Sequence, residues 1–211
     1  MTLGIVQARL GSSRLPRKAL MEIGGGAIIQ RVIDRAKQVR GVDRVVLACP
    51  AQDASGLGGV LSGGNAIIVV SCPEDDVLQR FALVLERYPN HDTVMRITGD
   101  CPLIDPLVCE RVLALYRSTP GCEYAWTNTR DGEWPDGLDC EVFSASALRR
   151  AHRDAKHPSD REHVTSWIRR HHTVGGRTVG LPPDPVYRGW PKVSVDTLED
   201  LERVRQMVEG C

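Results

Sequence analysis

Short apolar runs alternate with segments of helical period along the first half of the chain. Runs at residues 3–6, 45–48, 66–70 and 94–97 predict buried strands. Between them, apolar residues recur at three- and four-residue spacing, as over 28–36 and 77–88, which predicts amphipathic helices. Strands that alternate with helices are typical of βαβ units. We therefore predict an α/β fold in three layers, with a mostly parallel, mixed sheet.

The pattern becomes irregular after about residue 118. The expected elements are then β-like pieces at 124–126 and 141–143, helices over 145–155 and from Ser159 onward, a strand at 193–195 and a last helix over 197–208. Ser159 and Glu162 form a capping-box pattern, which places the start of the second helix. The length favours a single domain over residues 1–211, with a small irregular arm over about 125–175.

Composition narrows the class of partner. The 211 residues are 42% hydrophobic, and 27 basic side chains balance 27 acidic ones, whereas extended nucleic-acid surfaces carry a basic excess. No apolar run reaches the roughly 18 residues of a membrane span, and no secretory signal opens the chain. Seven cysteines without a C-x-x-C pair argue against a disulfide framework or a zinc ribbon. We expect a cytoplasmic protein with no nucleic-acid or membrane partner.

The segment after the first apolar run, QARLGSSRLPRK over residues 7–18, carries the strongest chemical signal. Ligands of open α/β sheets bind at the carboxyl ends of the strands, where this segment is expected. Its small residues let backbone N–H groups approach an anion, and Arg14 and Lys18 add charge for phosphate oxygens. It is neither a Walker A loop nor G-x-G-x-x-G. An exposed basic loop with surface ion pairs is the alternative.

The pattern A-R-x-x-S-x-R-L-P-x-K at residues 8–18 resembles the signature of cytidylyltransferases that activate acidic sugars. The resemblance is greatest to the spore coat polysaccharide biosynthesis protein F family, related to the 3-deoxy-manno-octulosonate and acylneuraminate enzymes. Further motifs follow in the family's order: DDVLQR (75–80), RITGDCPLID (96–105), PDGLDCEVF (135–143), DREHVT (160–165) and VDTLEDL (195–201). Two positions depart from the pattern: Arg17 replaces the usual Gly, and Ala27 replaces a frequent Pro.

The resemblance implies a fold of nucleotide-diphospho-sugar transferase type. It implies transfer of CMP from CTP to the hydroxyl of an acidic sugar, with release of diphosphate, by a homodimer built through the arm. The implied nucleotide contacts are Ala8, Arg9, Ser13, Arg14, Lys18, Pro50, Asp76 and Arg80. The implied acceptor contacts are Asn128, Asp136, Gly137, Asp139, Glu141, Arg161, Glu162 and His163, with Arg161 suited to the acceptor's carboxylate. Arg14, Lys18 and Asp100 would be catalytic, and Asp100 and Asp196 would hold Mg²⁺.

Several of these residues have a second interpretation from local structure. Asp76 and Asp196 each precede a predicted helix and would serve as N-caps, as Asp105 is expected to do before Pro106. Asp136 belongs to a Pro-Asp-Gly turn. Two other functions also stay open: a nucleotidyltransferase with another base or a non-sugar acceptor such as a phosphonate, and a non-catalytic nucleotide-binding relative.

Overall fold

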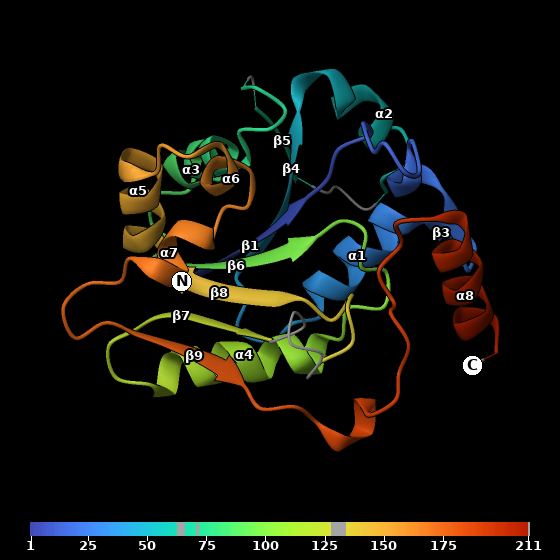
Figure 1. Ribbon diagram of the computed structural model, residues 1–211. Helices are drawn as coiled ribbons and strands as arrows, with labels where there is room; N and C mark the ends of the chain where they lie inside the picture. Colours follow the sequence, from blue (N-terminus) through green and yellow to red (C-terminus); the bar gives the residue numbers. More distant parts are fainter. Residues whose placement is uncertain (63–65, 71, 128–133, 211) are drawn as a thin grey trace.

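The central feature of the computed structural model is a seven-stranded sheet in the order β5-β4-β1-β6-β8-β7-β9 (Figure 1). Its strands are β1 (Thr2–Gln7), β4 (Arg44–Pro50), β5 (Ala66–Val70), β6 (Thr93–Thr98), β7 (Cys122–Thr127), β8 (Cys140–Ser144) and β9 (Arg177–Leu181). The structure describes residues 1–62, 66–70, 72–127 and 134–210. Strands β5, β4, β1 and β6 are parallel, and β8 runs antiparallel between β6 and β7. The predicted mixed, mostly parallel sheet is confirmed.

Helices cover both faces of the sheet and enclose two hydrophobic cores. One core holds residues of α1 (Ile28–Lys37), α2 (Ala54–Gly58), α4 (Pro106–Ser118) and α8 (Leu198–Glu209). The other holds residues of α3 (Val77–Arg87), α5 (Ala145–Asp154) and α7 (Ser166–Arg170). Strand β1 serves both cores, because Leu3 and Ile5 point to one face and Val6 to the other. Each such fully buried side chain stabilises the fold by roughly 1.5–3 kcal/mol. Because the sheet lies between two layers of helices, the three-layer prediction is also confirmed.

Short elements connect the layers. They are β2 (Glu22–Ile23), β3 (Gly26–Ala27), α6 (Pro158–Glu162) and the 3₁₀ turns η1 (Lys18–Leu20), η2 (Ala51–Asp53) and η3 (Pro185–Tyr187). Ala27 ends the small β2–β3 hairpin with φ −63°, a value that proline also adopts. None of the helices in the described residues has both the length and the apolar composition of a membrane-spanning segment.

The strand expected at 193–195 is not formed. Val193 and Ser194 donate their backbone N–H groups to the carbonyl of Asp136 at 2.7 and 3.1 Å, and Val195 donates to Asp100 at 2.9 Å. The segment is therefore held by two loops instead of a sheet ladder. Val193 and Val195 are fully buried, so their apolar alternation reports core packing, which a sequence pattern does not distinguish from a strand.

The helix expected from Ser159 is broken into α6 and α7. His157, not Ser159, caps α6, because its side chain accepts from the Ser159 N–H. Val164 adopts φ +46°, which ends the helical path between the two pieces. The break turns the Thr165 hydroxyl onto Glu141 at 2.8 Å, and this tertiary contact competes with a continuous helix.

The caps of the other helices show which of the predicted aspartates serve as N-caps. Asp105 caps α4 through the Leu107 N–H at 2.8 Å, and Asp76 caps α3 through Gln79 at 3.0 Å, as expected. At α8 the cap is Thr197, which forms a capping box with Asp200. The interpretation of Asp196 as the cap is therefore wrong, and its carboxylate is available for other contacts.

Candidate active site

The loop that follows β1 meets the turn that follows β6 at one edge of the sheet. Gly99 donates its N–H to the carbonyl of Gln7 at 2.8 Å. A Cβ atom on Gly99 would lie 2.8 Å from that oxygen and 2.9 Å from the Cβ of Ala8, so only glycine permits the approach. This contact brings Asp100 beside the basic segment predicted to bind phosphate.

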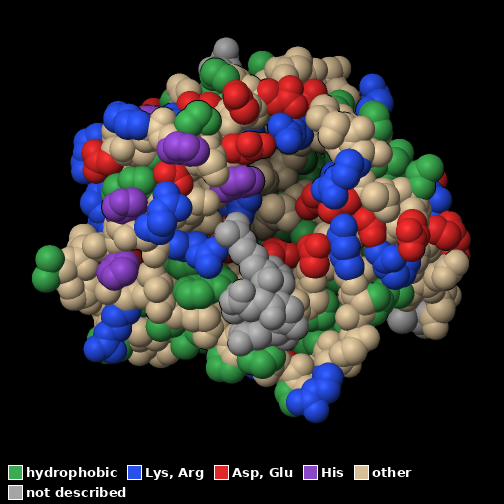
Figure 2. All heavy atoms as spheres, viewed as in Figure 1, with side chains coloured by type: hydrophobic (Ala, Val, Ile, Leu, Met, Phe, Trp, Pro, Cys, Tyr) green, Lys and Arg blue, Asp and Glu red, His purple; other side chains and the backbone are tan. Residues whose placement is uncertain are grey.

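Two cavities open at this edge, where the molecular surface is hollowed between basic and acidic side chains (Figure 2). The first, here named the β1-loop cavity, has a volume of about 300 Å³. It collects these predicted site residues: Ala8, Arg9, Ser13, Arg14, Lys18, Arg80, Asp100, Glu162, His163 and Asp196. Residues that are up to 188 positions apart in the sequence therefore line one hollow. Glu162 and His163, expected at the acceptor, lie on the side expected for the nucleotide.

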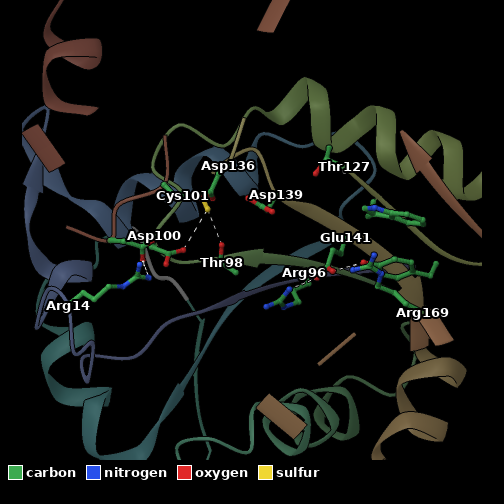
Figure 3. Close-up of a pocket in the computed structure, with 14 residues that line it drawn as sticks. Arg14, Arg96, Thr98, Asp100, Cys101, Thr127, Asp136, Asp139, Glu141 and Arg169 are labelled. Atoms are coloured by element: carbon green, nitrogen blue, oxygen red, sulfur yellow. Dashed lines mark hydrogen bonds and ion pairs between the residues drawn. The ribbon is translucent and has the colours of Figure 1, made fainter. Parts of the chain in front are cut away.

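The second cavity, here named the β8 cavity, has a volume of about 320 Å³ (Figure 3). Of the predicted acceptor residues it holds Asp136, Asp139 and Glu141. It shares its boundary with the β1-loop cavity at Arg14, Arg96, Thr98, Asp100 and Asp196. Two sites of small-molecule size therefore meet at one set of charged groups.

Lys18 lies at that boundary between two carboxylates. Its Nζ is 2.7 Å from Asp100 Oδ2 and 2.8 Å from Asp196 Oδ1. Burial alone would lower the pKa of Lys18, but the charge of Asp100 and the hydrogen bonds to both carboxylates raise it. Burial would raise the pKa of Asp196, yet Lys18 and Lys192 lower it. Lys18, Lys192 and Asp196 are therefore charged at neutral pH.

The same two carboxylates fit a divalent cation. Asp100 and Asp196 converge on one positive group, the Lys18 ammonium, so a single ion could contact both. Within the described part of the chain, no cluster of three or more His, Cys, Asp or Glu side chains is placed to hold a metal alone. Two carboxylates that leave the other positions to water and phosphate are the kind of set that Mg²⁺ favours.

Glu141 has both carboxylate oxygens occupied. One accepts from the Tyr124 hydroxyl and from Thr165 Oγ at 2.8 Å, and the other pairs with Arg96. Arg96 in turn donates to Gln7 Oε1 at 3.0 Å. Burial would raise the pKa of Glu141, but Arg96 and the hydrogen bonds lower it. Glu141 lines the β8 cavity as a charged, fully bonded group that holds Arg96 in place.

Several predicted residues lie outside both cavities. Asp76, besides its capping bond, pairs with Arg161 at 2.7 Å, and Arg161 also donates to the His152 carbonyl. Pro50 is buried at the end of β4, and Gly137 is buried in a turn at φ +107°. Asn128 lies outside the described residues. Asp136 combines both of its interpretations, because it belongs to the turn, accepts from Ser194 Oγ at 2.8 Å and lines the β8 cavity.

Sequence reasoning missed part of the cavity wall. In the β8 cavity, the lining residues that were not predicted are Arg96, Thr98, Cys101, Tyr124, Trp126, Thr127, Arg169 and Ser194. Arg96 begins the motif at residues 96–105, but it pairs with Glu141 only because β6 and β8 are neighbouring strands in the sheet. Trp126 and Arg169 come from elements 43 positions apart, with no spacing pattern to connect them.

Comparison with known proteins agrees with this architecture. The cytidylyltransferase family profile matches residues 3–206. The chain is 27% identical to the spore coat polysaccharide biosynthesis protein SpsF of Bacillus subtilis, over 97% of this chain and 85% of that protein. It is 29% identical to a 3-deoxy-manno-octulosonate cytidylyltransferase of Idiomarina loihiensis, over 98% of this chain and 85% of that protein.

A cytidylyltransferase structure from Leptospira borgpetersenii has the same fold. The TM-score is 0.85 at 24% identity, and the match covers all of this chain and 87% of the other. The fold, the profile and the ordered motifs therefore agree over nearly the whole length. The chain belongs to the cytidylyltransferase family, whose members transfer a cytidylyl group from CTP.

Proposed function

We propose that this enzyme transfers CMP from CTP to a hydroxyl of an acidic sugar of the octulosonic or nonulosonic type, releases diphosphate and serves surface polysaccharide synthesis. The observation that carries the proposal is the shared boundary of the two cavities. There Arg14 and Lys18 face Asp100 and Asp196, with Arg14 2.9 Å from Asp196. A nucleotide triphosphate and an acceptor in adjoining cavities would bring the α-phosphate and the attacking hydroxyl to these groups.

The β1-loop cavity is the proposed site for CTP. Ala8, Arg9 and Ser13 come from the loop and Arg80 from α3. Arg80 is only 2% exposed, and its described contacts are two backbone carbonyls, with Nε unbonded. A buried guanidinium nitrogen without an acceptor is costly, so we assign the Nε of Arg80 to an acceptor atom of the bound nucleotide.

The charged boundary supplies the chemistry. Arg14 and Lys18 lie where the departing diphosphate gains negative charge, and fixed cations there lower the barrier. Asp100 and Asp196 would hold Mg²⁺, which neutralises phosphate charge when bound. Lys18 contacts the same two carboxylates, so binding of substrate would turn its ammonium from Asp100 and Asp196 toward the phosphates.

The β8 cavity is the proposed site for the acceptor. Asp136, Asp139 and Ser194 give it hydrogen-bonding groups of the kind that recognise sugar hydroxyls. His163 and Glu162 border the neighbouring cavity and would contact the bound nucleotide or the near end of the acceptor.

The homodimer remains a prediction, to be checked by analytical ultracentrifugation.

Diphosphate release from CTP with Mg²⁺ tests the proposal, measured over octulosonic acids, nonulosonic acids, neutral sugars and phosphonates. Activity confined to the acidic sugars is expected. Asp100→Asn should abolish it, whereas Asp154→Asn, an exposed acid on the same molecule, should not. Turnover with phosphonates or neutral sugars alone would overturn the acceptor assignment.

A further inference from the structure

Arg169 forms one end of an aromatic stack in the wall of the β8 cavity. Its guanidinium carbon lies 5.3 Å from the ring centre of Trp126. Trp126 stacks on Tyr124 with ring centres 5.0 Å apart and planes 25° apart. Stacking of this kind holds a guanidinium in a fixed place. Figure 3 shows Arg169 and Arg14 on opposite sides of the cavity.

The charges of the cavity single out Arg169. Three arginines line it, and two of them are neutralised: Arg14 pairs with Asp196, and Arg96 pairs with Glu141. Among the residues that the structure describes, the Arg169 guanidinium has neither a carboxylate partner nor a hydrogen bond, and its recorded side-chain contact is with Trp126. It is therefore free to bind an anionic ligand.

Arg161, the arginine expected to bind the acceptor, is committed elsewhere. Its guanidinium pairs with Asp76 and donates to the carbonyl of His152, and it lies outside the cavity. Arg161 instead joins α6 to α3. Arg169, eight positions later, is therefore the arginine that can bind the anion.

We propose that Arg169 determines acceptor specificity by binding the acceptor's carboxylate at the side of the β8 cavity opposite Arg14. This inference rests on the proposed function. The acceptor would then span the cavity, with its hydroxyl near Asp100. A guanidinium edge matches a carboxylate with two parallel hydrogen bonds.

The charge of the cavity favours a carboxylate over a phosphate. Five acidic side chains line it: Asp100, Asp136, Asp139, Glu141 and Asp196. A phosphate ester near −2 would meet about twice the repulsion of a monoanion at the same place. Arg169 supplies a single positive charge, which one carboxylate matches.

Calorimetric titration tests the assignment with 3-deoxy-manno-octulosonate and N-acetylneuraminate, each against its methyl ester, and with a hexose phosphate. The wild-type enzyme should bind at least one acid roughly 10- to 100-fold more tightly than its ester and than the hexose phosphate. Arg169→Gln should remove this preference, and Arg169→Lys should restore part of it. Arg153→Gln is the matched control, because Arg153 is an exposed arginine (68%) at the end of α5.

Turnover supplies the second readout. Arg169→Gln should raise the KM for the acid roughly 10- to 100-fold and leave kcat and the KM for CTP unchanged. Thermal unfolding within about 2 °C of the wild type verifies that the variant is folded. Equal binding of acid and ester by the wild type, tighter binding of the hexose phosphate, no binding of either acid, or an unchanged affinity in Arg169→Gln would overturn the assignment.

The two proposals fail differently. If no acid supports diphosphate release by the wild-type enzyme, the proposed function is wrong, whatever the titration shows. If the wild type turns over an acid and Arg169→Gln does so with the same KM, only the role of Arg169 is wrong.

Discussion

The ammonium of Lys18 lies 2.7 Å from Asp100 and 2.8 Å from Asp196, so one lysine joins carboxylates 82 and 178 positions away. This contact ties the loop after β1 to the turn after β6 and to the segment before α8. It also means that the cation of the loop occupies the place proposed for Mg²⁺.

Lys18→Met should therefore affect turnover and metal binding in opposite directions. Diphosphate release at saturating CTP should fall roughly 100- to 1,000-fold, since a fixed charge at the leaving group is lost. Binding of Mn²⁺ without nucleotide, followed by electron paramagnetic resonance, should become tighter because Asp100 and Asp196 are no longer neutralised by Lys18.

Lys192→Met is the matched control for that variant. Lys192 contacts the other oxygen of Asp196 at 2.7 Å and also Asp200, but it lines neither cavity. Its loss should reduce turnover by less than about 10-fold. Equal losses in the two variants, or unchanged Mn²⁺ binding in Lys18→Met, would contradict the assignment of Lys18.

Arg17→Gly should stabilise the protein. Arg17 adopts φ +59°, the left-handed conformation that the glycine common in the family would adopt without strain. Relief of about 1–2 kcal/mol of strain, less the extra freedom of glycine in the unfolded chain, predicts a gain of about 0.5–1 kcal/mol, or a Tm higher by about 1–4 °C.

Arg17→Ala separates backbone strain from side-chain contacts. Alanine keeps the penalty for positive φ, and the exposed Arg17 side chain forms no ion pair or hydrogen bond with the described residues. Its Tm should match that of the wild type. A Tm gain as large as that of Arg17→Gly would show that strain is not the cause.

The sequence predicts best what depends on neighbouring residues. The strand and helix periods, the cap at Asp105 and the placement of Asp100 after a strand all follow from local patterns, and each is found. The basic loop is also found beside Asp100, because parallel strands end at one edge of the sheet.

The sequence predicts poorly what tertiary contacts decide. Residues 193–195 read as a strand, but bonds to Asp136 and Asp100 replace the ladder. The helix expected from Ser159 breaks where Thr165 turns toward Glu141. Arg161 and Arg169 lie eight positions apart, and only their contacts with Asp76 and Trp126 distinguish their roles.

Arg161→Gln should weaken the fold and leave substrate binding intact. The Arg161–Asp76 pair is about four-fifths buried, with side chains 21% and 19% exposed, and it joins α6 to α3. Its loss should reduce the free energy of unfolding in urea by about 1–2 kcal/mol, with the KM values unchanged. A KM for the acceptor raised 10-fold or more at wild-type stability would return the carboxylate-binding role to Arg161.

Glu141→Gln should remove a pH-dependent part of the stability. Burial would raise the folded-state pKa of Glu141, but the charge and hydrogen bond of Arg96 and the hydroxyls of Tyr124 and Thr165 lower it from its ordinary value of 4.5. A lowered pKa stabilises the fold above pH 4.5, and the contribution is lost as the pH falls through the folded-state value. Wild type and variant should differ by about 3 kcal/mol at pH 7 and by less below pH 4 in urea unfolding. A difference that is the same at both pH values would contradict this linkage.

Gly137→Ala should disrupt the support of the acceptor cavity. Gly137 has φ +107°, and a Cβ atom there would overlap the backbone nitrogen of Ser194 and lie 2.6 Å from the carbonyl carbon of Val193. The turn and the 193–195 segment, which orients Asp136 and Asp196, would have to separate, at a cost of about 3–5 kcal/mol in urea unfolding and a loss of turnover. Gly25→Ala is the control: Gly25 has φ +80°, and no atom of the described residues lies within 4 Å of the added Cβ, so backbone strain alone, about 1–2 kcal/mol, should result. Equal losses in the two variants would mean that the clash with Ser194 and Val193 is relieved without displacing the loop.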